Sequence, residues 1–419
     1  MSESAPASNK PVHAPMAQFP VQQGELIVGG QRLSVLAERV GQTPFYAYDR
    51  GLLKARVAQL RAALPAAVKL HYAMKANPMP ALVGLMAGLV DGIDVASAGE
   101  LKVALDAGAD PAEISFAGPA KRAVELRQSV AAGVLVNVES ERELPLLAEA
   151  SQALGLPARV ALRVNPDFEL KGSGMKMGGG PKQFGIDAEV LPEVMARIGR
   201  MAGDGLAFEG FHLFAGSQNL KAESICEAQQ KSYELALRLA ADAPAPVRFL
   251  NLGGGFGIPY FPGETPLELA PIGANLQALV ERAARELPQA SLVIELGRYL
   301  VGEAGVYVAR VLDRKISRGQ VYLVTDGGLH HHLSASGNFG QVIRKNYPAM
   351  LSQTRGETAR EAASVVGPLC TPLDLLADRM ELTAAQPGDL AVIYQSGAYG
   401  ASASPQAFLG HGGCPEILV

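Results

Sequence analysis

A lysine at the end of an apolar run is the first residue of this sequence that could do chemistry. Lys75 closes the segment 68–75, "VKLHYAMK", whose composition is typical of a buried strand. Lysine is among the residues least often fully buried, and a partly desolvated lysine amine can bond covalently to a carbonyl carbon. The alternative is a lysine whose charge extends from the strand end into solvent. We interpret Lys75 as the anchor of a carbonyl compound.

Two further segments contain residues that could take part in chemistry. "GGGFG" (253–257) offers glycines whose N–H groups can approach a phosphate, and a following helix N-terminus would add positive potential. The segment does not match the dinucleotide-binding pattern GxGxxG, because Ile258 stands where the last glycine belongs. A structural turn is the alternative for these glycines. Glu295 lies in "LVIELG" (292–297), where an isolated glutamate would otherwise be an ordinary ion-pair partner.

These residues fall at the ends of a repeating series of elements. Most of eight short apolar runs precede an Ala- and Leu-rich stretch with helical spacing; the runs are 68–75, 92–97, 114–118, 135–140, 159–165, 208–216, 249–255 and 292–297. Eight alternations of strand and helix predict a (β/α)8 barrel of the TIM type. Polar residues at the carboxyl ends of barrel strands face one site, and those ends hold Lys75, Ser97, Asn165, Ser217, the glycines after Leu252, and Glu295.

The sequence after residue 300 has a different rhythm. Short β-branched runs such as "GVYVARVLDRK" and "DLAVIYQSGAYG" are separated by Gly, Pro and Asp, which predicts an antiparallel β domain. We therefore divide the chain into a loose N-terminus (1–20), one or more strands that join the β domain (21–42), a barrel that begins at "TPFYAYD" (43–298), and a C-terminal β domain (299–419).

Composition limits the kind of protein. The 419 residues, 48% of them hydrophobic, suffice for two domains with a large core. The 37 basic and 41 acidic residues are scattered, which argues against a nucleic-acid partner. Cys226, Cys370 and Cys414 are too few and too far apart for a disulfide framework. With no signal-peptide pattern and no apolar run of membrane-spanning length, we expect a cytoplasmic protein that has no membrane partner.

A series of short motifs runs in one order from about Thr43 to the C-terminus: "TPFYAYD", "YAMKAN", "DVASAGEL", "LRVNP", "GSQ", "GGGFG", "ELGR", "GPLC" and "GAYG". In this order they resemble the pyridoxal-phosphate-dependent decarboxylases of the alanine racemase-like fold, which include diaminopimelate and ornithine decarboxylases. The resemblance implies pyridoxal 5'-phosphate as cofactor, an amino-acid substrate, and a homodimer with shared active sites. The "GPLCTPLD" version is most similar to members of biosynthetic clusters, including exosortase-associated ones, in which the amino acid can be tethered to an acyl or peptidyl carrier protein.

The resemblance also implies roles for single residues. Lys75 would hold the cofactor, and Glu295 would keep its pyridine nitrogen protonated, which favours decarboxylation; racemases of this fold place an arginine there. Cys370 would reach the other subunit's cofactor and return a proton after CO2 leaves, although a lone cysteine is more often a small buried hydrophobe. The phosphate would be held by Ser217, Gly254, Gly255, Gly297, Arg298 and Tyr399, with Arg298 binding the substrate carboxylate in some members.

Departures from the family pattern concern the substrate. Thr371 stands where the family has an acid that binds the substrate's distal ammonium, and a neutral hydroxyl cannot supply that charge-assisted hydrogen bond. Phe214 stands where a histidine stacks on the pyridine ring, with His212 two residues earlier on the same face. Phe214 can stack but cannot carry charge. Arg344 and Tyr347, our candidates for substrate binding, are three residues apart where the family spacing is four.

Two remaining segments have simpler interpretations. The glycine-rich stretch 171–185 follows a barrel strand and is expected to form a mobile lid over the substrate. "HHH" (330–332) is expected to be a loop rather than a zinc site, because consecutive strand residues alternate between faces and cannot chelate one ion together.

The sequence thus predicts a homodimeric, pyridoxal-phosphate-dependent decarboxylase of an L-amino acid, or of a derivative, that lacks a free distal ammonium. Three alternatives stay open. They are a diaminopimelate decarboxylase, an amino-acid racemase, and a catalytically silent homologue that binds the cofactor.

Overall fold

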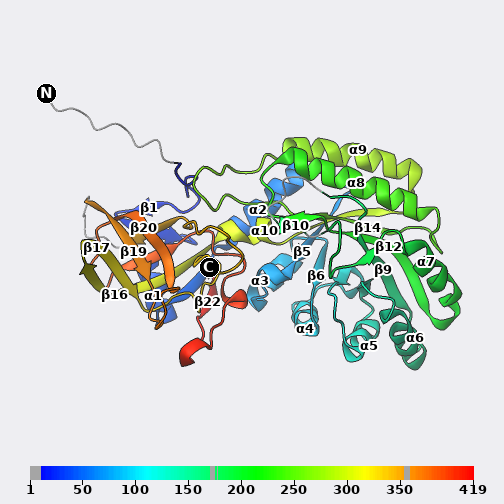
Figure 1. Ribbon diagram of the computed structural model, residues 1–419, viewed down its shortest axis with the longest axis horizontal. Coiled ribbons are helices and arrows are strands. Elements are labelled where there is room, and N and C mark those ends of the chain that lie inside the picture. Colours follow the sequence, from blue (N-terminus) through cyan, green and yellow to red (C-terminus); the bar gives the residue numbers. More distant parts are fainter. Residues whose placement is uncertain (1–10, 170–174, 177, 353–358) are drawn as a thin grey trace.

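Two domains lie side by side in the computed structural model of the protein, which describes residues 11–169, 175–176, 178–352 and 359–419 (Figure 1). Helices that surround a set of strands form one domain, drawn mostly in blue, cyan and green, and a strand-rich domain in yellow, orange and red forms the other. Both predicted architectures are therefore present.

The first domain is a closed barrel of parallel strands. Its strands are β5 (Lys69–Ala73), β6 (Gly92–Val95), β7 (Ile114–Phe116), β8 (Leu135–Val138), β9 (Ala158–Asn165), β12 (Leu206–Leu213), β14 (Phe249–Gly254) and β15 (Ser291–Leu296). Consecutive strands pair in parallel from β5 to β9 and on through β12, β14 and β15, and β15 pairs with β5 to close the ring. All eight predicted strands and the predicted fold class are confirmed.

Helices connect the barrel strands on the outside. They are α2 (Arg50–Ala63), α3 (Pro80–Ala87), α4 (Ala98–Asp106), α5 (Ala123–Ala132), α6 (Glu143–Leu154), α7 (Leu191–Arg200), α8 (Ala222–Ala240), α9 (Ala270–Glu286) and the short α10 (Arg298–Val301). In α7 the buried residues recur every three or four positions from Leu191 to Ile198. Ser97 caps α4, because its hydroxyl accepts a hydrogen bond from the Glu100 N–H at 3.1 Å. Ser97, a strand-end candidate, thus has a structural role.

The second domain contains a mixed sheet. Its strands are β16 (Gly305–Ser317), β17 (Gln320–Thr325), β18 (Ala349–Ser352), β19 (Arg360–Val366), β20 (Leu375–Thr383), β21 (Leu390–Ile393), β4 (Phe45–Tyr48) and β22 (Glu416–Leu418). Most pairings are antiparallel, as predicted, whereas β17 with β19 and β22 with β4 are parallel. Both chain ends therefore contribute to this domain.

The start of the barrel differs from the predicted boundary at residue 43. Strand β4, which lies in "TPFYAYD", pairs with β16 and β22 of the second domain, so the barrel begins only with α2. Phe45 and Ala47 pack into one hydrophobic cluster and Tyr46 and Tyr48 into another. A strand buried on both faces has the same apolar composition in a barrel and in a sheet between two layers, which explains the difference.

The N-terminal segment forms a small layer of its own. Strands β1 (Val21–Gln22), β2 (Glu25–Val28) and β3 (Gln31–Arg32) make a three-stranded sheet followed by α1 (Leu33–Val40). This layer forms a separate sheet and does not extend the large one. It packs on that sheet instead, because Leu26 and Leu36 share a cluster with Val306 and Val392.

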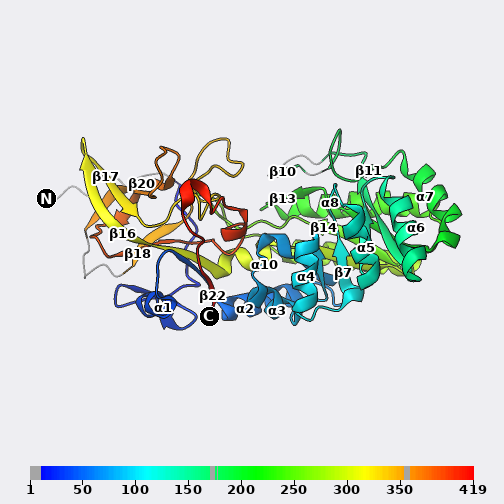
Figure 2. The same ribbon diagram turned by 90° about the horizontal axis from the view of Figure 1, so that it is seen from below.

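The predicted lid lies partly within the described residues. Strand β10 (Met175–Lys176) pairs with β13 (Gly216–Ser217), and β11 (Ile186–Asp187) pairs with β9. Figure 2 shows β10, β11 and β13 on the side of the barrel opposite to α2 and α3. Residues 170–174 and 177 lie outside the described residues, and the mobility of the lid stays a prediction.

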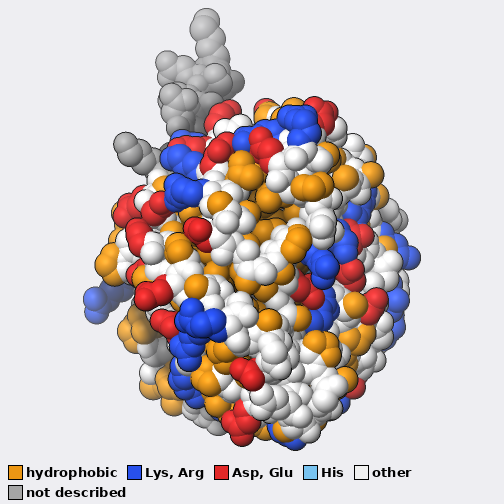
Figure 3. Space-filling view, turned by 90° about the vertical axis from the view of Figure 1, so that its right-hand side faces the viewer, with side chains coloured by type: hydrophobic (Ala, Val, Ile, Leu, Met, Phe, Trp, Pro, Cys, Tyr) orange, Lys and Arg blue, Asp and Glu red, His pale blue; other side chains and the backbone are white. Residues whose placement is uncertain are grey.

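The charged surface agrees with the scattered charges of the sequence. Figure 3 shows the face at the outer end of the barrel, where Lys and Arg side chains alternate with Asp and Glu. Neither sign forms a continuous patch on this face. No helix in the described part of the chain is long and apolar enough to span a bilayer.

Candidate active site

A pocket at the carboxyl ends of the barrel strands brings together most of the predicted site residues. It is lined by Ala73, Lys75, Phe214, Ser217, Gly255, Phe256, Glu295, Leu296, Gly297, Arg298 and Tyr399. Eight of these eleven residues were predicted from the sequence, and Tyr399 comes from the second domain. The pocket therefore lies where the barrel meets the β domain.

Lys75 follows β5 in a single helical turn, Met74–Ala76. Its side chain is exposed rather than buried, and its Nζ lies 5.4 Å from the ring centroid of Phe214. The backbone N–H of Tyr399 donates to the carbonyl oxygen of Ala76 at 2.7 Å, which ties the turn to the second domain. The lysine amine and the aromatic ring thus face each other across the pocket.

Glu295 lies at the end of β15 and is 7% exposed. His212 Nε2 and Asn251 Nδ2 donate hydrogen bonds to its Oε2, at 2.9 and 3.0 Å. Burial raises the pKa of this carboxyl, but His212 and its hydrogen bond, together with Lys75, outweigh burial and hold the pKa at about 2. Glu295 is therefore ionised at neutral pH despite its burial.

Gly255 and Gly297 give the pocket a wall of backbone, whereas Gly254, also predicted, does not line it. A Cβ on Gly254 would lie 1.9 Å from the Glu295 carbonyl oxygen, one on Gly255 would lie 2.2 Å from that of Gly216, and one on Gly297 would lie 2.9 Å from that of Ala73. Only residues without a side chain fit these positions. No helix follows the glycine segment directly, because α9 begins at residue 270. The predicted helix N-terminus behind this segment is therefore wrong, and the N–H groups of the loop must act without it.

Arg298 places a cation in the lining of the pocket. Its Nη1 donates to the Tyr260 hydroxyl at 3.0 Å, and its guanidinium carbon lies 4.6 Å from the Tyr399 ring centroid. Its Nε is buried and has no hydrogen-bond partner among the described residues. Burial lowers the pKa of Arg298, but the neighbouring tyrosine hydroxyls outweigh burial, so the net pKa lies above its usual value. Arg298 therefore offers a permanent charge and an unused donor for an anion.

The substrate candidates do not all gather at this pocket. Tyr347 is buried with its ring centroid 4.5 Å from that of Tyr260. It therefore packs against the tyrosine whose hydroxyl accepts the hydrogen bond of Arg298. Arg344 points elsewhere, because its Nε and Nη2 donate to the carbonyl oxygens of Ser336 and Leu375 at 2.9 and 2.6 Å. The structure thus separates the two residues that the sequence suggested as a pair.

Cys370 and Thr371 also lie outside the pocket of their own chain. Cys370 is exposed, and Thr371 is half-buried in the loop after β19. The Thr371 hydroxyl oxygen accepts the N–H of Leu373 at 3.3 Å. Neither residue lines the pocket that holds Lys75.

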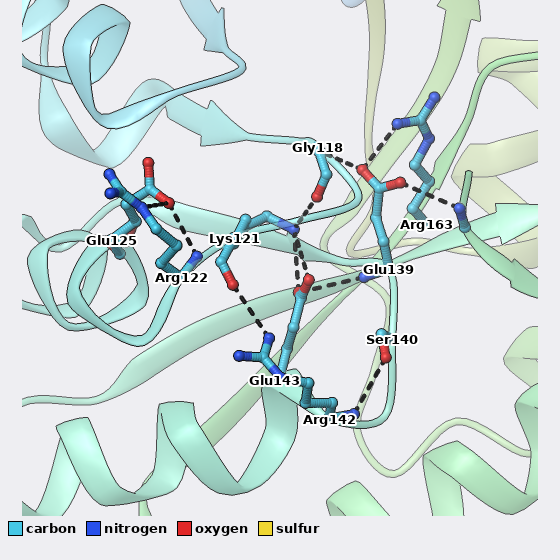
Figure 4. Close-up of polar contacts among 11 residues, drawn as sticks. Gly118, Lys121, Arg122, Glu125, Glu139, Ser140, Arg142, Glu143 and Arg163 are labelled. Carbon is cyan, nitrogen blue, oxygen red and sulfur yellow. Dashed lines mark hydrogen bonds and ion pairs between the residues drawn. The ribbon is translucent and has the colours of Figure 1, made fainter. Parts of the chain in front are cut away.

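A buried ion-pair network lies at the same end of the barrel (Figure 4). Arg163 on β9 donates to Glu139 at 2.8 Å, and Lys121 Nζ lies 3.0 Å from Glu143. Burial raises the pKa of Glu139, but Arg163 and Lys121 outweigh it and the net pKa is lowered. Glu139 also accepts the N–H of Gly185 at 3.1 Å. The network therefore fixes the end of the predicted lid to the barrel.

Asn165, another strand-end candidate, holds the same segment. Its side chain accepts the N–H of Gly179 at 3.1 Å and donates to the carbonyl oxygen of Gly180 at 2.9 Å. Asn165 is therefore a lid anchor rather than a wall of the pocket.

Two functional residues were missed in the sequence. His212 and Asn251 hold Glu295, and they lie on strands β12 and β14 that flank one another. The signal for His212 was its position on the same strand face as Phe214. Asn251 is an isolated amide inside an apolar strand, and buried polar side chains require partners.

The tri-histidine segment is buried in a turn region between β17 and β18. The ring centroids of His330 and His331 lie 3.8 Å apart, and His332 Nε2 pairs with the Ser396 hydroxyl at 2.9 Å. Within the described ranges, no three His, Cys, Asp or Glu side chains are placed to hold a metal ion.

A barrel with a strand-end lysine, a buried ionised carboxylate and a glycine wall defines the class of vitamin-B6-dependent barrel enzymes. Comparison with known proteins agrees. The family model described as the pyridoxal binding domain of pyridoxal-dependent decarboxylases matches residues 50–302. The chain belongs to the pyridoxal-dependent decarboxylase family, and it is a pyridoxal-phosphate-dependent amino-acid decarboxylase of the alanine racemase-like fold.

Individual relatives match nearly the whole chain. L-glutamyl-[BtrI acyl-carrier protein] decarboxylase of Niallia circulans is 39% identical over 382 residues, which are 90% of this chain and 89% of that protein. Diaminopimelate decarboxylase of Aquifex aeolicus is 33% identical over 388 residues, with 90% and 87% covered. The crystal structure of diaminopimelate decarboxylase from Helicobacter pylori complexed with L-lysine superposes with a TM-score of 0.80, at 28% identity and over 92% and 94% of the two chains.

The residues present fit pyridoxal phosphate. Gly255 and Gly297 line the pocket with backbone alone, which would let a phosphate approach main-chain N–H groups. Arg298 adds a charge with an unused donor. Glu295 is ionised and could hold a protonated ring nitrogen, and Lys75 would provide an amine for the aldehyde.

Proposed function

We propose that this enzyme decarboxylates an amino acid that lacks a free distal ammonium, and that the substrate is an L-glutamyl group carried on an acyl carrier protein. One observation carries the proposal. The loop that holds Cys370 and Thr371 offers no free carboxylate to a distal ammonium, because its single acid, Asp374, accepts the N–H groups of Leu329 and Leu369 at 2.6 and 2.8 Å. Removing such an acid removes a hydrogen bond typically worth about 1.5–3 kcal/mol.

The relatives support the same substrate class. The Niallia circulans protein, whose name specifies an L-glutamyl group on a carrier protein, is 39% identical to this chain, whereas the Aquifex aeolicus diaminopimelate decarboxylase is 33% identical. A thioester of glutamate has no distal ammonium. It therefore matches a loop with a hydroxyl in place of the acid.

We also propose a homodimer in which each chain completes the other's site. Cys370 is exposed and does not line the pocket of its own chain. Near it, Leu373 is 59% exposed, and Val342 and Ile343 are 101% and 77% exposed. Asn338 donates to the Leu373 carbonyl oxygen at 3.4 Å, which connects the two segments. Exposed apolar residues of this kind mark an interaction surface, and a second copy would place Cys370 over a cofactor.

The mechanism assigns separate tasks to the residues of the chain. Pyridoxal phosphate, when bound, supplies an electron-accepting ring for the bond that breaks between Cα and the carboxylate. Lys75 would provide the amine that holds the cofactor. Glu295 would hold a proton on the ring nitrogen, and Phe214, which lines the pocket beside Lys75, would cover one face of the ring. Cys370 of the other chain donates a proton from its thiol to Cα after CO2 leaves.

A direct assay tests the substrate. Purified holoenzyme is incubated in parallel with L-glutamyl-carrier protein, free L-glutamate and meso-diaminopimelate, and CO2 release is measured. We expect release from the carrier-bound substrate alone. Conversion of meso-diaminopimelate to lysine at a comparable rate would contradict the proposal, and so would exchange of the Cα hydrogen for deuterium without CO2, which indicates a racemase. A lack of turnover with all three would also contradict the proposed substrate.

A matched pair of variants tests the role of the loop. Thr371→Glu restores the acid of diaminopimelate decarboxylases, and Thr371→Ser keeps the hydroxyl. We expect only the glutamate variant to lower the KM for meso-diaminopimelate, with cofactor content unchanged in both. Equal KM values for meso-diaminopimelate in the two variants would show that residue 371 does not bind the distal end of the substrate.

A further inference from the structure

A histidine that no part of the proposed mechanism uses is bonded to the central carboxylate. His212 lies on β12, is 1% exposed, and donates from Nε2 to Glu295 Oε2 at 2.9 Å. An ionised carboxylate can only accept hydrogen bonds, so the proton of this contact belongs to Nε2. The other ring nitrogen, Nδ1, is buried and has no partner among the described residues.

This hydrogen bond rules out a different use of the ring. His212 and Phe214 share a strand face, and His212 could have replaced the stacking histidine that this chain lacks. Because the ring is directed at Glu295 from inside the barrel and is fully buried, it cannot also cover a cofactor in the pocket. Phe214, which lines the pocket opposite Lys75, is the residue placed to stack.

Among the described residues, hydrogen-bond donors contact only one oxygen of the Glu295 carboxylate, Oε2. Asn251 is 0% exposed and donates to the same Oε2 at 3.0 Å, while its own carbonyl oxygen accepts the Gly253 N–H at 2.8 Å. In the described part of the chain, Oε1 receives no hydrogen bond. Two donors thus fix the plane of the carboxylate and leave its second oxygen for a partner in the pocket.

We infer that His212 is a positioning residue, which together with Asn251 keeps Glu295 ionised and directs its free oxygen to the ring nitrogen of the cofactor. The inference needs only the cofactor of the family, not the carrier-bound substrate, so the two can fail independently. Without the His212 donor, the buried carboxylate would lose a hydrogen bond to a charged group, and its hold on the protonated ring nitrogen would weaken.

The test compares two cofactors that differ in one atom. Pyridoxal phosphate carries the ring nitrogen, and its 1-deaza analogue has a C–H group there; both can bond to Lys75. Apoprotein of the wild type, of His212→Leu and of His212→Gln is titrated with each, and bound cofactor is measured by absorbance after ultrafiltration. We expect His212→Leu to weaken binding of pyridoxal phosphate by about 10- to 100-fold, which corresponds to one hydrogen bond to a charged group, and to leave binding of the analogue nearly unchanged. His212→Gln, whose amide can donate to Glu295, should restore most of the difference.

Controls separate this role from a structural one. His71→Leu removes another buried barrel histidine, whose ring pairs with Asp94 at 3.0 Å, and should affect both cofactors equally. Equal weakening of both cofactors by His212→Leu would overturn the inference, as would a failure of His212→Gln to restore the difference. If His212→Leu does not fold, Asn251→Ala removes the other donor to the same oxygen, and the same comparison of cofactors decides.

Discussion

Replacing Gly255 by alanine tests whether the glycine segment forms the phosphate cup. Gly255 has a φ of +75°, and a Cβ there would lie 2.2 Å from the Gly216 carbonyl oxygen and 3.5 Å from the Cα of Ser217. Both atoms belong to the backbone, so no side-chain rotation relieves the overlap. The loop must move away from β13, and its N–H groups then move away from the phosphate.

The size of the effect follows from comparison with Gly41→Ala. Gly41 ends α1 with a φ of +79°, and a Cβ added there would have no other atom within 4 Å. A left-handed backbone costs an alanine roughly 1–2 kcal/mol at either site. Overpacking adds about 1–3 kcal/mol at Gly255 alone. Because about 1.4 kcal/mol is a factor of ten, the cofactor should bind roughly 5- to 150-fold more weakly to Gly255→Ala.

Two measurements separate the strain from the contact. Urea unfolding of the apoproteins should show a loss of stability in both variants, and titration with pyridoxal phosphate should show weaker binding only in Gly255→Ala. If Gly255→Ala binds the cofactor as tightly as Gly41→Ala, the close approach at residue 255 has no role in the phosphate site, and our assignment of the cup is refuted.

Further predictions concern other parts of the site. Lys75→Ala should retain no covalently bound cofactor after borohydride reduction, by mass spectrometry, and mixing it with Cys370→Ala should restore CO2 release that neither variant has alone; no recovery would argue against shared sites. Lys121→Ala should lower the free energy of unfolding by about 3–5 kcal/mol, because it leaves a buried carboxylate unpaired, whereas Lys102→Ala on the surface should cost less than about 1 kcal/mol. The lowered pKa of Glu295 means that its ionised form stabilises the fold above its usual pKa of 4.5, and that this stability is lost as pH falls from 4.5 to about 2. Unfolding of the holoenzyme measured against pH should therefore show this loss in the wild type and not in Glu295→Gln.

The barrel and its reaction centre were predictable because each depends on local signals. Alternating strands and helices set the order of the elements, and the parallel strands then place their carboxyl ends together. Lys75, Ser217 and Glu295 are far apart in sequence but follow from that rule alone. Gly297, Arg298 and Tyr399 of the same pocket were predicted from the family resemblance instead, and Tyr399 comes from the second domain.

Other features could not be read from the sequence because they depend on tertiary pairing. Strand β4 is buried on both faces, which fits a barrel strand and a sheet between two layers equally well. Arg344 and Tyr347 are neighbours in sequence but face different surroundings, since the first bonds to backbone carbonyl oxygens and the second packs on Tyr260. The role of His212 required knowledge that β12 and β15 bring it to Glu295.

Phe214 is a departure from the family pattern within the barrel, whereas the departures at Thr371 and Arg344 lie in the β domain, in a way that the fold explains. Lys75, Glu295 and the glycine wall belong to the barrel, whose packed strands tolerate little change. Thr371 and Arg344 lie on loops of the β domain, where a substitution changes what a substrate meets without disturbing the barrel. On our proposal, the barrel therefore holds the cofactor, and the β domain determines which substrate is accepted. This division predicts that exchanging the loop 367–374 for that of a diaminopimelate decarboxylase changes the preferred substrate while the absorbance spectrum of the bound cofactor stays the same. A changed spectrum would mean that the two domains do not act separately.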